Sequence, residues 1–194
     1  SFHVTGVQTC ALPICYFIEP VLHAHDRARF EVTCYYAHEK ADDATARMRV
    51  VADRWREVAS IDGTALAEQI RADGIDILVD LAGHSKGNKL AAFALKPAPL
   101  QVTWMGYPDT TGLPAIDLRL TDAVADPALQ AEGLHSERLA RIDGCFLSYQ
   151  PPADSPPADD PLAGVNDLAT AKDVLTKANN DYNDALTAYG AAVD

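Results

Sequence analysis

The feature that most constrains this chain is a regular alternation of strand-like and helix-like segments between residues 16 and 122. Apolar, β-branched and aromatic runs alternate with segments whose apolar residues recur at helical spacing. The predicted strands are FEVTCYY (30–36), EVASI (57–61), IDILVDL (75–81), LQVTWMG (100–106) and LRLTD (118–122). The predicted helices are YFIEPVLHAHD (16–26), DDATARMRVVADRW (42–55), DGTALAEQIRADG (62–74) and NKLAAFALK (88–96).

Residues that begin and end helices support this division. Asp42 or Asp43 is suited to cap the second helix, and Asp62 the third. Gly74 ends the third helix, and Pro20 is expected in the first turn or two of the first. Alternating strands and helices with short connections predict an α/β fold: a Rossmann-like parallel sheet with helices on both faces and right-handed crossovers.

Two glycine-rich stretches follow predicted strands directly. AGHSKGNKL (82–90) follows the strand at 75–81, and GYPDTTGLP (106–114) follows the strand at 100–106. In open parallel sheets, ligands bind beyond the carboxyl ends of the strands. Because both stretches leave from such ends, we expect them side by side on one rim, with glycines that allow a close approach of the backbone to a ligand. Neither stretch is a GxGxxG motif or a P-loop.

The side chains of these stretches suggest contacts with a sugar or a phosphate. His84 can donate a hydrogen bond, and Lys86 and Lys89 add positive charge. Tyr107 and Pro108 can form a wall against a sugar ring, and Thr110 offers a hydroxyl. Each residue also has an ordinary structural use, because loop histidines satisfy backbone carbonyls and turn threonines cap backbone groups. No nucleophile–base set can be assembled from spacing, so the catalytic residues are unknown.

Composition narrows the function classes. The net charge of −12 argues against a nucleic-acid partner, and no apolar run approaches the length of a membrane span. The four cysteines form no CxxC pair and have no zinc-ligand spacing, so we expect no metal site. Reduced, mostly buried thiols are the simplest interpretation, which favours a cytoplasmic protein.

The N-terminal residues resemble something other than a protein segment. VTGVQTCALPI (4–14) is similar to the in-frame translation of a common sequencing-adapter oligonucleotide. We therefore expect residues 1–15 to be artefactual or disordered, and the folded lobe to occupy residues 16–149. A genuine but unusual N-terminal strand is the alternative.

The composition changes again near the C-terminus. Residues 150–165 contain five prolines and several aspartates and predict an extended linker. In residues 166–190, Leu168, Leu175, Tyr182 and Tyr189 recur every seven residues, which predicts an amphipathic heptad helix. Its narrow apolar stripe needs a partner, either the lobe itself or a second copy of the chain.

The middle of the chain resembles a known family. The run DGIDILVDLAGHSKGNKLAAFALKPAPLQVTWMGYPDTTGLPAIDLRLTDAVADP (73–127) is similar to the catalytic region of the protein O-linked N-acetylglucosamine transferases, in the SPINDLY-like branch common in bacteria. The flanking segments at 16–36 and 137–152 fit the same family. The resemblance implies two Rossmann-like lobes, of which this chain matches the N-terminal one.

The resemblance also implies an activity. Such enzymes move N-acetylglucosamine from UDP-N-acetylglucosamine to Ser or Thr hydroxyls of acceptor proteins, invert at the anomeric carbon, and need no metal or further cofactor. By similarity, Met105, Gly106 and Pro108 would line the sugar pocket. His84, Lys86 and Lys89 would lie on the neighbouring loop.

Three departures suggest that this chain is an incomplete fragment, inactive alone. A histidine that the family has just before the segment matching Tyr16 has no equivalent, and Trp55 stands where animal relatives have another histidine. The second lobe, which supplies most contacts to the diphosphate, is replaced by the linker and heptad helix. Two alternatives stay open: a non-catalytic α/β module that associates through its tail, and a chimeric reading frame without a function of its own.

Overall fold

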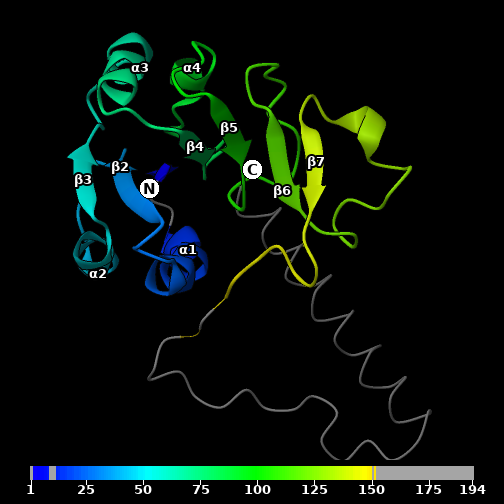
Figure 1. Cartoon of the computed structure of the whole chain (residues 1–194), viewed down its shortest axis with the longest axis horizontal. Helices are drawn as coiled ribbons and strands as arrows, with labels where there is room; N and C mark the ends of the chain where they lie inside the picture. The colour runs from blue at the N-terminus through cyan, green and yellow to red at the C-terminus, as the bar shows by residue number, and fades with distance from the viewer. Residues whose placement is uncertain (1, 9–11, 150, 152–194) are drawn as a thin grey trace, which may run out of the picture. The chain divides into compact units, whose positions relative to one another are not determined.

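The computed structural model describes residues 2–8, 12–149 and 151. Within these residues, seven strands form one sheet in the order β3-β2-β1-β4-β5-β6-β7, and every neighbouring pair is parallel (Figure 1). The strands are β1 Phe2–Gln8, β2 Phe30–Tyr36, β3 Arg54–Glu57, β4 Ile77–Asp80, β5 Leu100–Thr103, β6 Leu118–Thr121 and β7 Arg138–Arg141. The predicted linker (150–165) and heptad helix (166–190) lie outside the described residues, apart from Pro151.

Helices cover both faces of the sheet, which confirms the predicted fold class. Helices α1 (Leu12–Ala24) and α2 (Asp43–Val51) lie on one face, and α3 (Gly63–Ala72) and α4 (Leu90–Phe93) on the other (Figure 1). A short 3-10 helix, Glu132–Leu134, precedes β7. None of the helices in the described part of the chain is long and apolar enough to cross a membrane.

Local chemistry explains why two of these helices begin where they do. The side chain of Asp42 accepts a hydrogen bond from the Thr45 amide, while the Thr45 side chain accepts from the Asp42 amide, so α2 begins with a capping box. Asp62 accepts from the amides of Thr64 and Ala65 and caps α3. Beyond α3, Gly74 has a φ of +68°, the left-handed conformation that favours glycine after a helix.

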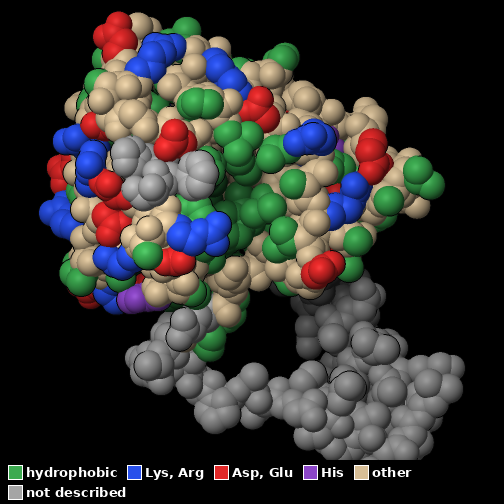
Figure 2. Space-filling model, in the orientation of Figure 1, with side chains coloured by type: hydrophobic (Ala, Val, Ile, Leu, Met, Phe, Trp, Pro, Cys, Tyr) green, Lys and Arg blue, Asp and Glu red, His purple; other side chains and the backbone are tan. Residues whose placement is uncertain are grey.

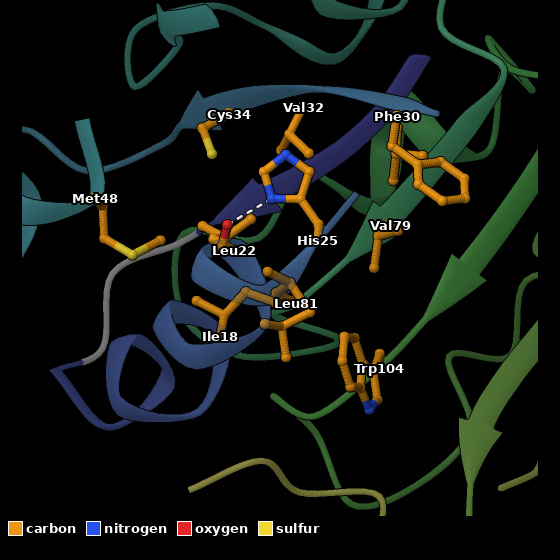
Figure 3. Close-up of a pocket in the computed structure, with 12 residues that line it drawn as sticks. Ile18, Leu22, His25, Phe30, Val32, Cys34, Met48, Val79, Leu81 and Trp104 are labelled. Carbon is orange, nitrogen blue, oxygen red and sulfur yellow. Dashed lines mark hydrogen bonds between the residues drawn. The ribbon is translucent and has the colours of Figure 1, made fainter. Parts of the chain in front are cut away.

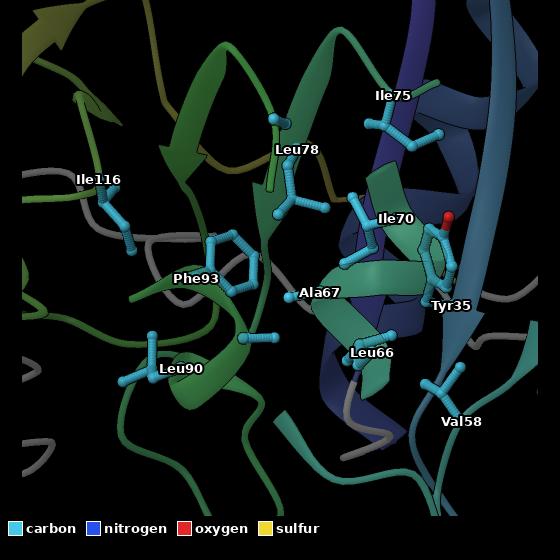
Figure 4. Close-up of a cluster of buried hydrophobic side chains, with 12 residues drawn as sticks. Tyr35, Val58, Leu66, Ala67, Ile70, Ile75, Leu78, Leu90, Phe93 and Ile116 are labelled. Carbon is cyan, nitrogen blue, oxygen red and sulfur yellow. The ribbon is translucent and has the colours of Figure 1, made fainter. Parts of the chain in front are cut away.

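Each layer of helices closes its own hydrophobic core. Under α3 and α4, fully buried side chains of both helices meet residues of β2 and β4 (Figure 4); the largest are Tyr35, Leu66, Ile70, Leu78 and Phe93. Under α1 and α2, the second core includes Cys15, Ile18, Leu22, Cys34 and Met48. Because both faces are covered, strand β4 is largely apolar, as predicted for residues 75–81, with Asp80 as a buried exception.

The strand order identifies where a ligand would bind. The chain builds outward from β1 to β2 and β3, and then returns to add β4, β5, β6 and β7 on the other side of β1. The order therefore reverses between β1 and β4, and the loop that leaves β4 starts at this switch point. In open parallel sheets such a point, at the carboxyl ends of the strands, is where ligands bind.

The expected start of the folded lobe at Tyr16 does not hold in the structure. Phe2–Gln8 forms the central strand β1, in register with β2 from Phe2↔Phe30 to Gln8↔Tyr36 and also paired with β4. Helix α1 begins at Leu12, four residues before the predicted boundary. The expectation of disorder is thus wrong for these residues, whatever the origin of their sequence.

Three smaller expectations are corrected at the edges of the elements. Strand β3 comprises Arg54–Glu57 rather than residues 57–61, so Trp55 lies in a strand and not on a helix. Strand β7 was not predicted. Both are edge strands with partly exposed, charged sequences, so they lack the apolar signature of a central strand. Pro20 lies in the body of α1 because the helix starts earlier than expected.

Candidate functional site

The two glycine-rich stretches lie side by side at the carboxyl ends of β4 and β5, as predicted. We call them the β4 loop (82–89) and the β5 loop (105–112). A Cβ atom added to Gly83 would lie 2.2 Å from the Cβ of Tyr107, and one added to Gly106 would lie 1.8 Å from the Leu81 carbonyl oxygen. Both glycines are therefore needed to let the loops approach each other. Figure 2 shows hydrophobic side chains gathered in the middle of this face, near β5 and β6.

A buried carboxylate ties the β4 loop to the sheet. Asp80 is 1% exposed and accepts hydrogen bonds from the amides of Ala82 (3.1 Å) and Gly83 (2.9 Å) and from the Thr103 hydroxyl of β5 (2.9 Å). Burial raises the pKa of Asp80, although these hydrogen bonds act in the opposite direction. The three donors fix the point where the β4 loop leaves the sheet.

A buried cation and a buried anion hold the β5 loop. Arg119 of β6 donates to the carbonyl oxygens of Tyr107, Pro108 and Asp109 at 2.9–3.1 Å. Glu137 accepts from the Thr111 amide at 2.8 Å and from the Thr110 hydroxyl at 2.7 Å. Burial opposes the ionisation of Glu137, but the hydrogen bonds from the two threonines outweigh it and lower its pKa. The backbone of the β5 loop is thus fixed by side chains of β6 and of the segment leading into β7.

Two predicted ligand contacts are occupied by the loops themselves. The Nε2 atom of His84 lies 2.9 Å from the Thr111 carbonyl oxygen, and its ring meets Tyr107 edge-on with centroids 5.2 Å apart. The Thr110 hydroxyl is bonded to Glu137 and accepts from the Gly112 amide. Both residues therefore shape the site, and the His84 ring links the β4 loop to the β5 loop.

The two lysines of the β4 loop differ in their surroundings. The Lys89 amine donates to the carbonyl oxygens of Ala59 (3.1 Å) and Ile61 (2.9 Å), and burial lowers its pKa. The Lys86 side chain is exposed and faces a hollow of about 740 Å³. The loop after β2, including His38 and Lys40, forms the other wall of this hollow. Of the two, Lys86 is the cation available to a ligand.

The start of the β5 loop has an unusual backbone. Met105 has a φ of +63°, a conformation that costs energy for a residue other than glycine. Its side chain packs against the core under α1 and α2, which compensates for this cost. The bend at Met105 brings Gly106 against Leu81 and turns Tyr107 toward the β4 loop, with Pro108 exposed beyond it.

A second hollow, on the α1 face, has a different character. It has a volume of about 250 Å³ and an almost wholly apolar lining, including Ile18, Phe30, Val79, Leu81 and Trp104 (Figure 3). None of the predicted site residues lines it. His25 lies at its border, with its side chain only 9% exposed.

Sequence reasoning missed the residues that hold the loops. Arg119, Glu137 and Asp80 are all buried and charged, and none was singled out. A weak signal existed for two of them: Arg119 and Asp80 each stand inside an apolar strand pattern, where a charge needs a partner. Glu137 gave no signal, because its partners Thr111 and Thr110 are 26 and 27 residues earlier in the chain.

This fold and site define a class: a parallel, doubly wound α/β lobe with paired glycine-rich loops at the carboxyl rim. Within the described residues, no group of three or more His, Cys, Asp or Glu side chains is placed to hold a metal ion. Comparison with known proteins then identifies the family. The profile of glycosyl transferase family 41 matches residues 5–149, so the chain belongs to this family.

Individual relatives support the same assignment. The chain is 44% identical over 161 residues to the probable UDP-N-acetylglucosamine–peptide N-acetylglucosaminyltransferase SPINDLY of Eustoma exaltatum subsp. russellianum, covering 81% of this chain and 17% of that protein. It is 37% identical over 139 residues to the UDP-N-acetylglucosamine–peptide N-acetylglucosaminyltransferase of Caenorhabditis elegans, covering 70% and 12%. The structure of a K341M mutant of Thermobaculum terrenum O-GlcNAc transferase aligns with a TM-score of 0.76 and 41% identity, covering 81% of this chain and 31% of that one.

These findings confirm the family resemblance inferred from residues 73–127. The chain has the sequence and fold of an O-GlcNAc-transferase-like glycosyltransferase. It spans about a sixth of the length of the SPINDLY relatives it matches. The family match begins at residue 5, inside the stretch that resembles a sequencing adapter.

Proposed function

We propose that this chain provides one half of the donor site of a protein O-linked N-acetylglucosamine transferase. The donor would be UDP-N-acetylglucosamine and the acceptors Ser or Thr hydroxyls of proteins, as the names of its relatives state for those proteins. The observation that carries the proposal is the close packing of Gly83 on Tyr107 and of Gly106 on Leu81. It supports a single rim at the switch point of a parallel sheet, which is where such folds bind nucleotides.

The residues of the rim suit a sugar and its phosphates in different ways. Gly106 packs its backbone against the Leu81 carbonyl, which brings the β5 loop close to the β4 loop, and Tyr107 and Pro108 would offer a flat surface to a pyranose ring. Lys86 is the exposed cation of the β4 loop and would face the anionic part of the donor. His84, Lys89 and Thr110 would support the site through the loop contacts described above.

The chain by itself is expected to bind the donor weakly and to transfer no sugar. A leaving diphosphate needs positive charge or hydrogen-bond donors placed around it, and losing such groups costs several kcal/mol of transition-state stabilisation, on the order of 3 kcal/mol per donor. The Lys89 amine is held by two backbone carbonyls, so Lys86 would act with little help. The part of the relatives that this chain does not match would have to supply the rest.

Titration of the ¹⁵N-labelled chain with UDP-N-acetylglucosamine tests donor binding. We expect amide shifts in the β4 and β5 loops, and an affinity at least threefold weaker for Lys86→Ala. The matched control is Arg29→Ala, which removes an exposed cation at the opposite, amino end of β2. Parallel titrations with UDP and GDP-fucose identify the preferred donor. Shifts confined to residues outside the two loops would rule out the proposed site.

A transfer assay tests the second part of the proposal. We expect no glycosylation of a Ser/Thr-rich peptide and no donor hydrolysis by the 194-residue chain. Turnover that disappears in Gly106→Trp and persists in Gly133→Trp would show that the chain is catalytically sufficient. Gly133 is the appropriate control because nothing lies within 4 Å of a Cβ atom built there.

We also propose a cytoplasmic location and self-association through residues 166–190. Cys34 and Cys145 are free thiols, which supports a reducing compartment. Burial and the nearby charge of Asp53 raise the pKa of the Cys34 thiol to about 12, so it would stay protonated and unreactive. The heptad spacing of leucine and tyrosine supports association, and sedimentation of the chain with and without residues 166–194 tests it.

A further inference from the structure

The β5 loop rests on one side chain that no sequence motif pointed to. Arg119 is 3% exposed, and its Nη1 atom donates to the carbonyl oxygens of Tyr107 (3.1 Å) and Asp109 (2.9 Å). Its Nη2 atom donates to the carbonyl oxygen of Pro108 at 2.9 Å. One planar guanidinium therefore binds three consecutive carbonyls of the loop.

The charge of Arg119 is balanced inside the lobe. Its Nε atom lies 3.2 Å from Oδ2 of Asp126, which is also buried and accepts a hydrogen bond from the Thr121 hydroxyl. His135 approaches the other carboxylate oxygen of Asp126 at 3.4 Å. A buried cation without such partners would be strongly destabilising. The Arg119–Asp126 ion pair therefore holds the guanidinium next to β6, and the Nη1 and Nη2 atoms of Arg119 donate to the loop.

The three carbonyl contacts determine in which direction the C=O and N–H groups of the loop point. In a trans peptide the C=O and N–H bonds point in opposite directions, and the described residues contain no cis peptide. With the Pro108 carbonyl turned toward Arg119, the amide of Asp109 points away from it. Glu137 fixes the next residues by accepting from the Thr111 amide. The peptide after Tyr107 leads into Pro108, which has no N–H, and the Thr110 amide donates to the Asp109 carboxylate at 2.7 Å. Arg119 therefore directs the Asp109 amide toward the opposite face of the loop.

We propose that Arg119 is a positioning residue for the donor site: its guanidinium fork sets the backbone of the β5 loop against the β4 loop. The role of the loop as a donor site rests on the function proposed above. Arg119 itself need not touch the donor, because it lies behind the loop and is buried. A lysine at this position would keep the charge opposite Asp126, but its single ammonium cannot reproduce the planar fork that binds three carbonyls.

Comparison of Arg119→Lys with Arg119→Met separates positioning from simple stabilisation. We expect Arg119→Met to lower the unfolding midpoint, and Arg119→Lys to lower it much less. Both variants should speed amide exchange at Thr111 and Leu113, whose amides bond within the loop network, by at least tenfold. Exchange at Val58, whose amide bonds to the Tyr36 carbonyl next to β3, should change less than twofold in Arg119→Lys.

The matched control is the pair Arg56→Lys and Arg56→Met. Arg56 makes one 2.7 Å contact with Asp73 from the opposite edge of the sheet, so neither variant should alter exchange in the β5 loop. The proposal is overturned if Arg119→Lys keeps the exchange rates of Thr111 and Leu113 within twofold of the parent chain. In that case the charge alone suffices, and the fork has no positioning role.

Donor affinity provides the functional readout. At equal fraction folded, Arg119→Lys should bind UDP-N-acetylglucosamine at least fivefold more weakly than the parent chain, and Arg56→Lys equally well. Unchanged affinity in Arg119→Lys, despite a loosened loop, would also overturn the proposal. If the parent chain binds no donor, that result counts against the proposed function, whereas the exchange rates still decide what Arg119 does to the loop.

Discussion

At the scale of single residues, the site depends on positions where a side chain must be absent. The backbone of Gly106 passes so close to the Leu81 carbonyl that no Cβ atom fits, and the contact is with backbone that cannot move aside easily. Gly83 packs against the side chain of Tyr107 and has a φ of +51°. These two glycines bring the loops together, and Lys86 is the nearby cation that stays available to a ligand.

Gly106→Ala is expected to destabilise the lobe strongly. The added methyl group would overlap the Leu81 carbonyl, and forced overpacking of this kind costs roughly 1–3 kcal/mol, occasionally more. Urea unfolding measures the loss. Gly133→Ala, where the added Cβ meets nothing within 4 Å, should change the free energy of unfolding by no more than about 0.5 kcal/mol. If both variants lowered the free energy of unfolding equally, the close contact between Gly106 and Leu81 would be contradicted.

The two lysines of the β4 loop should behave differently when neutralised. Lys89→Met leaves the carbonyls of Ala59 and Ile61 without their charged donor, which should cost about 1.5–3 kcal/mol. Lys86→Met removes an exposed charge and should change stability by no more than about 0.5 kcal/mol. Thermal unfolding of both variants checks this difference, and a reversal of the order would contradict the assigned environments.

At the scale of elements, the starts of α2 and α3 follow from the sequence more reliably than the edge strands do. The aspartates before α2 and α3 cap them through the backbone amides of their own first turns, an interaction of residues two or three apart. Strands β3 and β7 have no such local signal. They exist because β2 and β6 offer free edges, and partly exposed sequences such as RWRE and RLAR can add to them.

Asp42→Ala should remove the cap of α2, with a characteristic pH dependence. The loss at pH 7 is expected to be about 1 kcal/mol. Hydrogen bonds from Thr45 lower the pKa of Asp42, so its stabilising effect is full above its ordinary pKa of 3.8 and is lost as the pH falls through the lowered value. The stabilities of the two proteins should therefore converge in acid.

Asp43→Ala serves as the control for this prediction. Asp43 is the first residue of α2 and makes no cap hydrogen bond, so only its interaction with the helix dipole is lost, about 0.3–1 kcal/mol. Denaturant unfolding at several pH values compares the variants. A difference between parent and Asp42→Ala that stays constant from neutral to strongly acidic pH would contradict the capping role.

At the scale of the whole molecule, the chain divides into two compact units, Ser1–Pro152 and Ala153–Asp194. Both hydrophobic cores described above lie within the first unit. The seven described strands also belong to it. The first unit is therefore expected to fold without the second, and the association predicted for the heptad segment should reside in the second.

Removal of residues 153–194 tests this division. The unfolding midpoint of the shortened chain should stay within about 2 °C of the parent value. In a domain of this size, a change in the free energy of unfolding of roughly 0.5 kcal/mol shifts the midpoint by no more than about 2 °C. If the heptad segment associates, sedimentation should show an oligomer for the parent chain and a monomer for the shortened chain. If it does not associate, both chains should sediment as monomers. A shortened chain that fails to fold would contradict the independence of the first unit.

The amino-acid sequence by itself determined the fold class, the rim and the family. Hydrophobic periodicity and capping residues act over a few neighbouring positions, so they can be interpreted without coordinates. The run at 73–127 was specific enough to indicate the family, and the glycines of both loops were identified within it. The sequence also predicted, correctly, that the two loops share one rim, because parallel strands place their carboxyl ends together.

Only the tertiary structure decided which residues hold the site and which remain available to a ligand. It assigned Phe2–Gln8 to the centre of the sheet, turned His84 and Lys89 toward backbone carbonyls, and placed Arg119 and Glu137 behind the β5 loop. The physical reason is the same for the four side chains. A buried charge or a donor selects its partners by distance in the folded lobe, and those partners lie 10 to 30 residues away in the chain, beyond the range of any local pattern.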